Sequence, residues 1–178
     1  GLGGDLSPTT LLRAYCEGVF PWFNEGDPIL WWSPNPRAVI ELDGLHISRR
    51  LARTIRSGKF RVTINRCFEE VMRACGENRR EGTWITPQML AAYTELHRFG
   101  FAHSVETWLG DQLAGGVYGV AIGGLFAAES MFYRVSDGSK VALVSLVERL
   151  RDRGFELLDV QMTTCHTERM GAINIPRS

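Results

Sequence analysis

An acid and an amide two residues apart, Asp159 and Gln161, are the side chains that most clearly suggest chemistry in this sequence. They lie in and just after the apolar segment 155–160, which predicts a β-strand. Residues i and i+2 of a strand face the same side, so this carboxylate and amide can form one hydrogen-bonded unit beside a reacting amine. The alternative is that both side chains only satisfy the backbone at the end of the strand.

Glu129 is a second candidate, because it interrupts an otherwise apolar strand at 126–130. A carboxylate in such a run is rarely buried without a partner. We expect that partner to be a substrate ammonium; the alternative is a structural arginine such as Arg134.

The aromatic segment 20–36 predicts a rigid apolar cavity. Trp22, Trp31 and Trp32 are three of the chain's five tryptophans, and they fall within eleven residues, among prolines that exclude a regular helix. So many aromatic side chains in a proline-rich loop favour a shaped ligand site. Trp84 also has turn-forming neighbours, so we expect Trp22 and Trp84 on loops that line the cavity.

The segment 46–66, called the basic segment below, contains seven Lys or Arg residues and no acidic residue, although the formal net charge of the chain is zero. Ser48 and Gly58 predict the two ends of a helix, which places Arg49, Arg53 and Arg56 on one face. Like charges without counter-charges favour a polyanionic partner such as RNA. The alternative is an ordinary solvated basic face.

The composition indicates a soluble globular protein of 178 residues, with 44% hydrophobic and 22% charged residues. No apolar run is long enough to span a membrane and no signal peptide is apparent, so we expect a cytoplasmic protein. The four cysteines form no C-x-x-C pair, and the four histidines lack metal-ligand spacing. These patterns predict reduced thiols and no bound metal.

Two units are expected along the chain, a small N-terminal domain at 1–35 and a larger domain at 36–178. In the second unit the pattern predicts three antiparallel strands, then a long helix begun by Ser136 and Asp137, then one more strand. This order predicts an α+β fold, with a mixed sheet flanked by helices. In the first unit, Ser7 and Pro8 begin an expected short helix that Gly18 ends. In the second unit, the expected strands are 38–42, 60–64, 103–108, 112–120, 124–130 and 155–160, and the expected helices are 48–57, 67–75, 87–99 and 138–152.

Short strings along the whole chain resemble the leucyl/phenylalanyl-tRNA–protein transferases. The resemblance implies an acyl-CoA N-acyltransferase-like core and the transfer of Leu, Phe or Met from aminoacyl-tRNA to proteins with an N-terminal Arg or Lys, which tags them for degradation. It implies no cofactor. The strings are Phe20-Pro21-Trp22-Phe23, Pro28-Ile29-Leu30-Trp31-Trp32-Ser33-Pro34-Asn35-Pro36-Arg37, Glu81-Gly82-Thr83-Trp84-Ile85-Thr86-Pro87, Glu129-Ser130-Met131-Phe132 and Leu157-Leu158-Asp159-Val160-Gln161.

The same resemblance assigns roles to individual residues. Asp159, Gln161 and Glu129 are the expected catalytic residues, with Glu129 holding the α-amine of the aminoacyl group. The expected aminoacyl pocket consists of Trp22, Trp84, Val117, Phe126, Ala128, Leu143, Leu146 and Leu158. Together with this resemblance, the basic segment is interpreted as a tRNA contact made by Arg49, Arg50, Arg53, Arg56, Lys59 and Arg61.

Two other functions fit parts of the pattern. An acetyl-CoA-dependent N-acetyltransferase would share the fold, but its pyrophosphate loop, Arg/Gln-x-x-Gly-x-Gly/Ala, has no intact copy, and 112–117 fails at Val117. A non-catalytic RNA-binding protein would explain the basic segment but gives no role to Trp22, Trp84 or Asp159.

Overall fold

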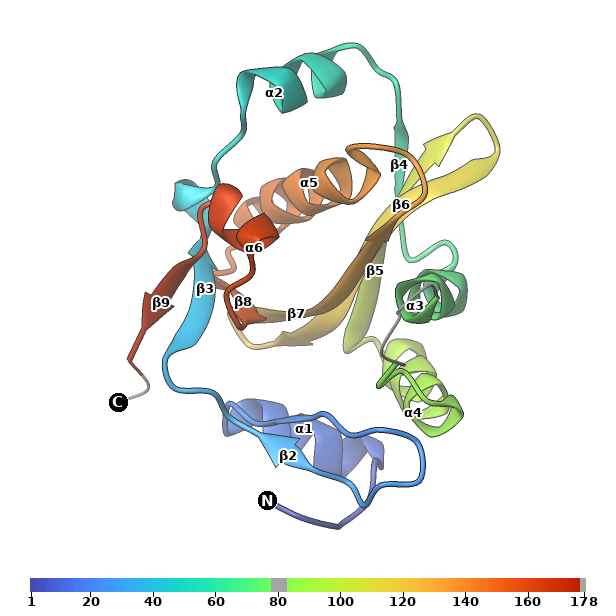
Figure 1. Ribbon diagram of the computed structural model, residues 1–178, viewed down its shortest axis with the longest axis vertical. Coiled ribbons are helices and arrows are strands. Elements are labelled where there is room, and N and C mark those ends of the chain that lie inside the picture. The colour runs from blue at the N-terminus through green and yellow to red at the C-terminus, as the bar shows by residue number, and fades with distance from the viewer. Residues whose placement is uncertain (78–82, 177–178) are drawn as a thin grey trace.

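A seven-stranded sheet forms the centre of the molecule (Figure 1). The computed structural model describes residues 1–77 and 83–176. The strands of this sheet, in chain order, are β3 (Arg37–Glu41), β4 (Arg61–Ile64), β5 (Ala102–Leu109), β6 (Gln112–Ile122), β7 (Leu125–Tyr133), β8 (Leu157–Gln161) and β9 (Ile173–Ile175). A separate two-stranded ribbon pairs β1 (Phe20–Pro21) with β2 (Trp31–Trp32). The helices are α1 (Pro8–Cys16), the 3-10 turn η1 (Leu42–Gly44), α2 (Arg49–Arg56), α3 (Phe68–Gly76), α4 (Pro87–Arg98), α5 (Gly138–Asp152) and α6 (Cys165–Arg169).

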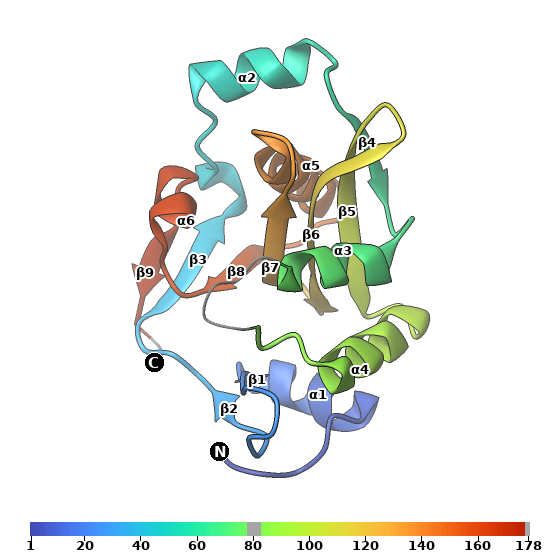
Figure 2. The same ribbon diagram turned by 45° about the vertical axis from the view of Figure 1, so that its right-hand side comes forward.

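The large sheet has the spatial order β4-β5-β6-β7-β8-β3-β9, and all its neighbours are antiparallel except β7 and β8. That parallel pair runs from Leu125 opposite Leu157 to Ala127 opposite Asp159. Both strands continue beyond this register, and Figure 2 shows them running apart. The predicted α+β class, with a mixed sheet flanked by helices, is confirmed.

Two apolar cores fill the two faces of the sheet. Helix α5 covers one face, with Leu143, Leu146 and Val147 in the same cluster as Leu158 of β8. Helices α1, α3 and α4 cover the other face and share a single cluster with sheet residues, so the N-terminal segment packs into the main core (Figure 1). The division at residue 35 stays a prediction.

The long helix α5 has the predicted bounds, but the residue before it does not cap it through its side chain. Asp137 is at the N-cap with φ 71°, and its side chain makes no capping hydrogen bond. Its carboxylate instead binds Arg50 at 2.8 Å and Lys140 at 3.6 Å. The basic segment therefore has a counter-charge after all, supplied from far along the sequence.

The elements that sequence patterns missed are all short. Strands β1 and β2 have two residues each, β9 has three and α6 has five, which is too few for a hydrophobic period to be visible. Helix α6 begins at a capping box, in which Thr164 and Thr167 each bond the backbone N–H of the other. The sequence pattern predicts no element in this region.

Glycines let α5 begin directly against the sheet. A Cβ atom on Gly115 of β6 would lie 2.7 Å from the backbone carbonyl carbon of Gly138 and from the N atom of Ser139. Because these neighbours are backbone atoms at the start of α5, a side chain there would push the helix away from the strand. Gly115 and Gly138 thus set how closely the helix packs on the sheet.

We expect Gly115→Ala to destabilise the protein by about 1–3 kcal/mol, the usual range for overpacking a close-packed site. Gly124→Ala is the matched control, because its Cβ atom would meet only the Glu156 side chain, at 3.6 Å. Urea unfolding followed by circular dichroism measures both. Equal midpoints for the two variants would contradict the proposed close approach.

Candidate active site

Two adjoining cavities open where β7 and β8 separate. The smaller, of about 270 Å³, is lined by Phe20, Pro21, Trp22, Trp84 and Gln161 together with four shared residues. The larger, of about 460 Å³, is lined on its own side by Ala128, Ser130, Met131, Tyr133, Ser139, His166 and Thr167. The shared residues are Glu129, Val160, Met162 and Thr164. Two of the three predicted catalytic residues, Glu129 and Gln161, therefore lie in cavity walls.

Trp22 and Trp84 line the smaller cavity, from segments far apart in the sequence. Trp22 follows β1, and its backbone N–H donates to the Leu30 carbonyl at 2.9 Å. Trp32 donates its indole N–H to the Trp22 carbonyl at 2.8 Å, and the two rings lie 6.1 Å apart. The first two residues of the string that carries Trp84, Glu81 and Gly82, lie outside the described residues.

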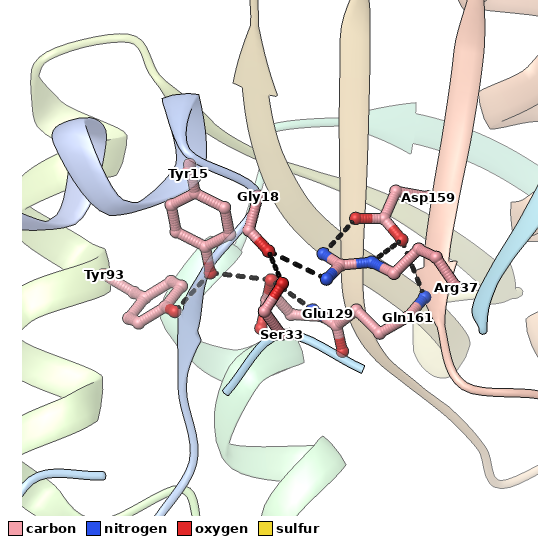
Figure 3. Close-up of polar contacts among 8 residues, drawn as sticks. All are labelled: Tyr15, Gly18, Ser33, Arg37, Tyr93, Glu129, Asp159 and Gln161. Carbon is pink, nitrogen blue, oxygen red and sulfur yellow. Dashed lines mark hydrogen bonds and ion pairs between the residues drawn. The ribbon is translucent and has the colours of Figure 1, made fainter. Parts of the chain in front are cut away.

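Glu129 is a buried carboxylate that neutral donors hold at one oxygen (Figure 3). The Tyr15 hydroxyl donates to Oε1 at 2.6 Å, and the Gln161 side-chain amide donates to the same atom at 2.8 Å. The hydroxyl of Tyr93 lies 2.5 Å from that of Tyr15. The alternative partner considered above, Arg134, binds Glu77 instead.

The orientation of Glu129 comes from a β-bulge. Along the β6–β7 ladder, Ala128 is opposite Gly119 and Ser130 is opposite Tyr118, which leaves Glu129 as the extra residue. A bulge turns a side chain away from the regular alternation of a strand and is common beside active sites. In this chain it brings the carboxylate to the junction of the two cavities.

The pKa of the Glu129 carboxyl is raised to about 8, first by burial and then by the nearby Asp159 charge, against the opposing effects of the Tyr15 and Gln161 hydrogen bonds and of the Arg37 charge. Burial and the Glu129 charge also raise the pKa of Tyr15 well above its ordinary value, and the pKa of Tyr93 is raised in the same way. Both phenols therefore stay protonated and can donate hydrogen bonds.

Asp159 makes its contacts with a cation and with the backbone. Arg37 binds it with two hydrogen bonds, Nε to Oδ1 at 2.9 Å and Nη2 to Oδ2 at 2.6 Å. Oδ1 also accepts the backbone N–H of Gln161 at 2.8 Å. The expected contact between the two side chains is replaced, because Gln161 has φ 64° and its amide reaches Glu129.

Comparison with known proteins identifies the family. The model described as leucyl/phenylalanyl-tRNA protein transferase matches residues 39–178, and the model of that family's N-terminal domain matches residues 4–35. The chain belongs to this family.

Curated relatives are similar in sequence over nearly the whole chain. A leucyl/phenylalanyl-tRNA–protein transferase of Magnetococcus marinus is 56% identical over 99% of this chain and 78% of its own length. One of Nitrosospira multiformis is 54% identical over 99% of this chain and 77% of its own length. A solved structure of a conserved protein of unknown function from Staphylococcus epidermidis matches with a TM-score of 0.52 at 11% sequence identity. The match covers 99% of this chain and 67% of the Staphylococcus chain, and at this identity it shows the fold alone.

The predicted pocket residues of this transferase fall into two groups. Trp22, Trp84 and Ala128 line the cavities. The other five are buried in the core between the sheet and α5, and none of these five described residues lines either cavity. They are Val117, Phe126, Leu143, Leu146 and Leu158. Their role in selecting the aminoacyl side chain stays a prediction.

The basic segment of the transferase forms an exposed surface at the end of the molecule opposite α1 (Figures 1 and 2). Arg50 is held by Asp137, Lys59 lies over the Phe60 ring and Arg61 lies over the Trp108 ring. All six predicted tRNA-binding residues are exposed: Arg49, Arg50, Arg53, Arg56, Lys59 and Arg61.

Three residues of the polar network were missed by sequence analysis: Arg37, Tyr15 and Tyr93. Arg37 ends one of the strings that carry the family resemblance, and a buried Asp159 implies a cation partner, so a signal for Arg37 existed. Tyr15 and Tyr93 look like the core positions of amphipathic helices, and their hydroxyl contacts follow only from the packing of α1 on α4.

Two features are absent from residues 1–77 and 83–176. No helix there has the length and apolar character needed to cross a bilayer. Within the same ranges, no three or more His, Cys, Asp or Glu side chains are grouped so that they could hold a metal ion.

The raised pKa of Glu129 has a consequence for stability. In the unfolded chain the carboxyl ionises above its ordinary pKa of 4.5, but in the folded protein it ionises only above its raised pKa of about 8. Between these values the folded state binds more protons than the unfolded state, so stability falls as pH rises, by up to about 1.4 kcal/mol per pH unit.

We expect Glu129→Gln to lack this loss, so its melting temperature should rise relative to wild type as pH increases from 5 toward 8. Thermal unfolding at several pH values in that window measures the difference. Glu148→Gln, on the exposed face of α5, is the control and should differ from wild type by a constant amount. If the melting temperature of Glu129→Gln also differs from that of wild type by a constant amount, then burial does not raise the pKa of the Glu129 carboxyl.

Proposed function

We propose that this protein transfers Leu, Phe or Met from aminoacyl-tRNA to the N-terminal amine of proteins that begin with Arg or Lys. Family membership supports the reaction class. The observation that carries the proposal is the buried Glu129 carboxylate at the junction of two cavities, one of them walled by Trp22 and Trp84.

The reaction needs little beyond positioning and proton transfer. The acceptor nitrogen forms a bond to the acyl carbon and gives up a proton, the bond from that carbon to the ribose oxygen breaks, and the ribose oxygen takes up that proton and leaves as a hydroxyl. The ester is already activated, so a covalent enzyme intermediate is unnecessary. The acceptor must be a neutral amine, and an α-amine has an ordinary pKa of about 7.7–8.0.

Glu129 is suited to holding the acceptor amine and taking its proton, which differs from the contact with the donor's α-amine that the family resemblance implies. Its pKa of about 8 is close to that of an α-ammonium group, so proton transfer between them is nearly balanced in free energy. Because the hydrogen bonds from Tyr15 and Gln161 both end on Oε1, Oε2 is the oxygen that we assign to the acceptor amine. The side-chain amide of Gln161 then orients the carboxylate and is not itself a base.

The donor is proposed to reach the cavities as the aminoacyl-adenosine end of tRNA, in contact with Trp22 and Trp84. The basic segment lies at the opposite end of the molecule from α1 in both views (Figures 1 and 2). One ligand that contacts both places must be long and anionic, as a tRNA is. An acetyl-CoA-dependent acetyltransferase and a non-catalytic RNA-binding protein are not favoured by the family membership.

Transfer itself is the primary test. Purified protein, Phe-tRNA and a peptide that begins with Arg should yield a peptide longer by one Phe, measured by mass spectrometry, without acetyl-CoA. A peptide of the same sequence that begins with Glu is the control and should stay unmodified. An unmodified Arg peptide, or an acetylated one when acetyl-CoA replaces Phe-tRNA, would overturn the proposal.

The tRNA surface has its own test. The double variant Arg49→Ala, Arg53→Ala should weaken tRNA binding and lower the slope of log K against log salt by about two, one for each lost phosphate contact. Arg13→Ala with Arg73→Ala is the matched control, because both are exposed arginines paired with a Glu four residues away. A salt slope equal to that of the control would place the docking surface elsewhere.

A further inference from the structure

Arg37 makes an ordered set of contacts that no role described so far requires. It begins β3, and its guanidinium binds both oxygens of Asp159 while the side chains are only 12% and 5% exposed. Its remaining nitrogen, Nη1, donates to the Gly18 carbonyl at 2.8 Å. Only the planar fork of arginine can bind a carboxylate in this two-bond manner.

The bidentate pair of Arg37 and Asp159, called the clamp below, is connected to Gln161 through one more hydrogen bond (Figure 3). Asp159 Oδ1 accepts the Gln161 backbone N–H at 2.8 Å, and Gln161 has φ 64°. A residue other than glycine is strained in this left-handed region and keeps that conformation only where the surroundings hold it there. The doubly held carboxylate supplies such a constraint at the end of β8.

The same guanidinium also supports the opposite wall of the smaller cavity. It lies 5.1 Å from the centre of the Phe20 ring, and Phe20 lines that cavity together with Gln161. Gly18 belongs to the turn that leads from α1 to Phe20. Arg37 thus connects both walls of the smaller cavity. Its positive charge compensates the negative charge of Asp159, which lies near Glu129.

We propose that Arg37 is a positioning residue for aminoacyl transfer: with Asp159 it holds Gln161 in the left-handed conformation that directs the side-chain amide to Glu129. Asp159 is then an anchor and not a base, since both its oxygens are occupied. Arg37 touches no reacting atom in this assignment. The role in catalysis rests on the proposed function, whereas the clamp itself can be tested without it.

Arg37→Lys keeps the charge but removes the fork, so we expect kcat to fall about 10- to 100-fold, the usual effect of misplacing a catalytic group. The KM for charged tRNA should stay within about twofold, because the residue does not contact the donor. Arg134→Lys is the matched control: Arg134 also binds one carboxylate, of Glu77, and lies 5.4 Å from an aromatic ring, that of Phe132. It should leave kcat unchanged.

Rates are divided by the folded fraction, measured by circular dichroism at the assay temperature. Arg37→Ala with added guanidinium provides a second variant, and the ion should restore part of kcat if the vacated fork site is what matters. A wild-type kcat in Arg37→Lys would overturn the positioning role. So would a loss of kcat in Arg37→Lys and Arg37→Ala that disappears once rates are divided by the folded fraction, if added guanidinium also restores nothing.

Hydrogen exchange of the wild-type protein tests the clamp independently of any transfer activity. The Gln161 amide should exchange at a rate within about tenfold of the paired amides of β8, because Asp159 accepts its proton. Exchange as fast as in the turn at Gly110 would show that the clamp is not formed. If the wild type transfers nothing while Gln161 is protected, the proposed function fails and the clamp stands.

Discussion

The separation of β7 and β8 is the constraint on which the rest of the site depends. The two strands are paired only as far as Ala127 and Asp159, and both continue past that point. The backbone and side chains beyond the split lose a neighbouring strand, which leaves room for a ligand but requires other partners for buried polar groups. Glu129 on one side and Gln161 on the other meet this requirement by bonding each other across the gap.

Two carboxylates near this split have contrasting surroundings. Asp159 is bound by the guanidinium of Arg37 in a bidentate ion pair. Glu129 has only neutral donors, the Tyr15 hydroxyl and the Gln161 amide, so burial dominates its titration. With its pKa raised to about 8, Glu129 can exchange a proton near neutral pH, whereas Asp159 is held in place by the Arg37 guanidinium and the Gln161 backbone N–H.

The sequence predicted the large elements and the chemical side chains but not the contacts between them. Helix α5 and the β5–β6–β7 meander are long enough for their hydrophobic periods to be visible, and they were predicted to within a few residues. Asp159, Gln161 and Glu129 were found because polar groups in apolar strands need an explanation. Their actual geometry depends on a bulge at Glu129 and a positive φ at Gln161, and neither feature has a glycine to signal it.

The N-terminal segment is part of the site and not an appendage to it. Tyr15 of α1 donates to Glu129, and the Gly18 carbonyl that follows α1 accepts from Arg37. The polar network therefore begins and ends on the same short segment, after passing through β3, β8 and β7. Because the hydrophobic core is also shared between α1, α4 and the sheet, displacement of this segment would expose apolar surface and leave the Glu129 carboxylate and the Arg37 guanidinium each short of one partner. The arrangement couples the fold of the first twenty residues to the orientation of Glu129, so packing and site geometry are held by the same contacts.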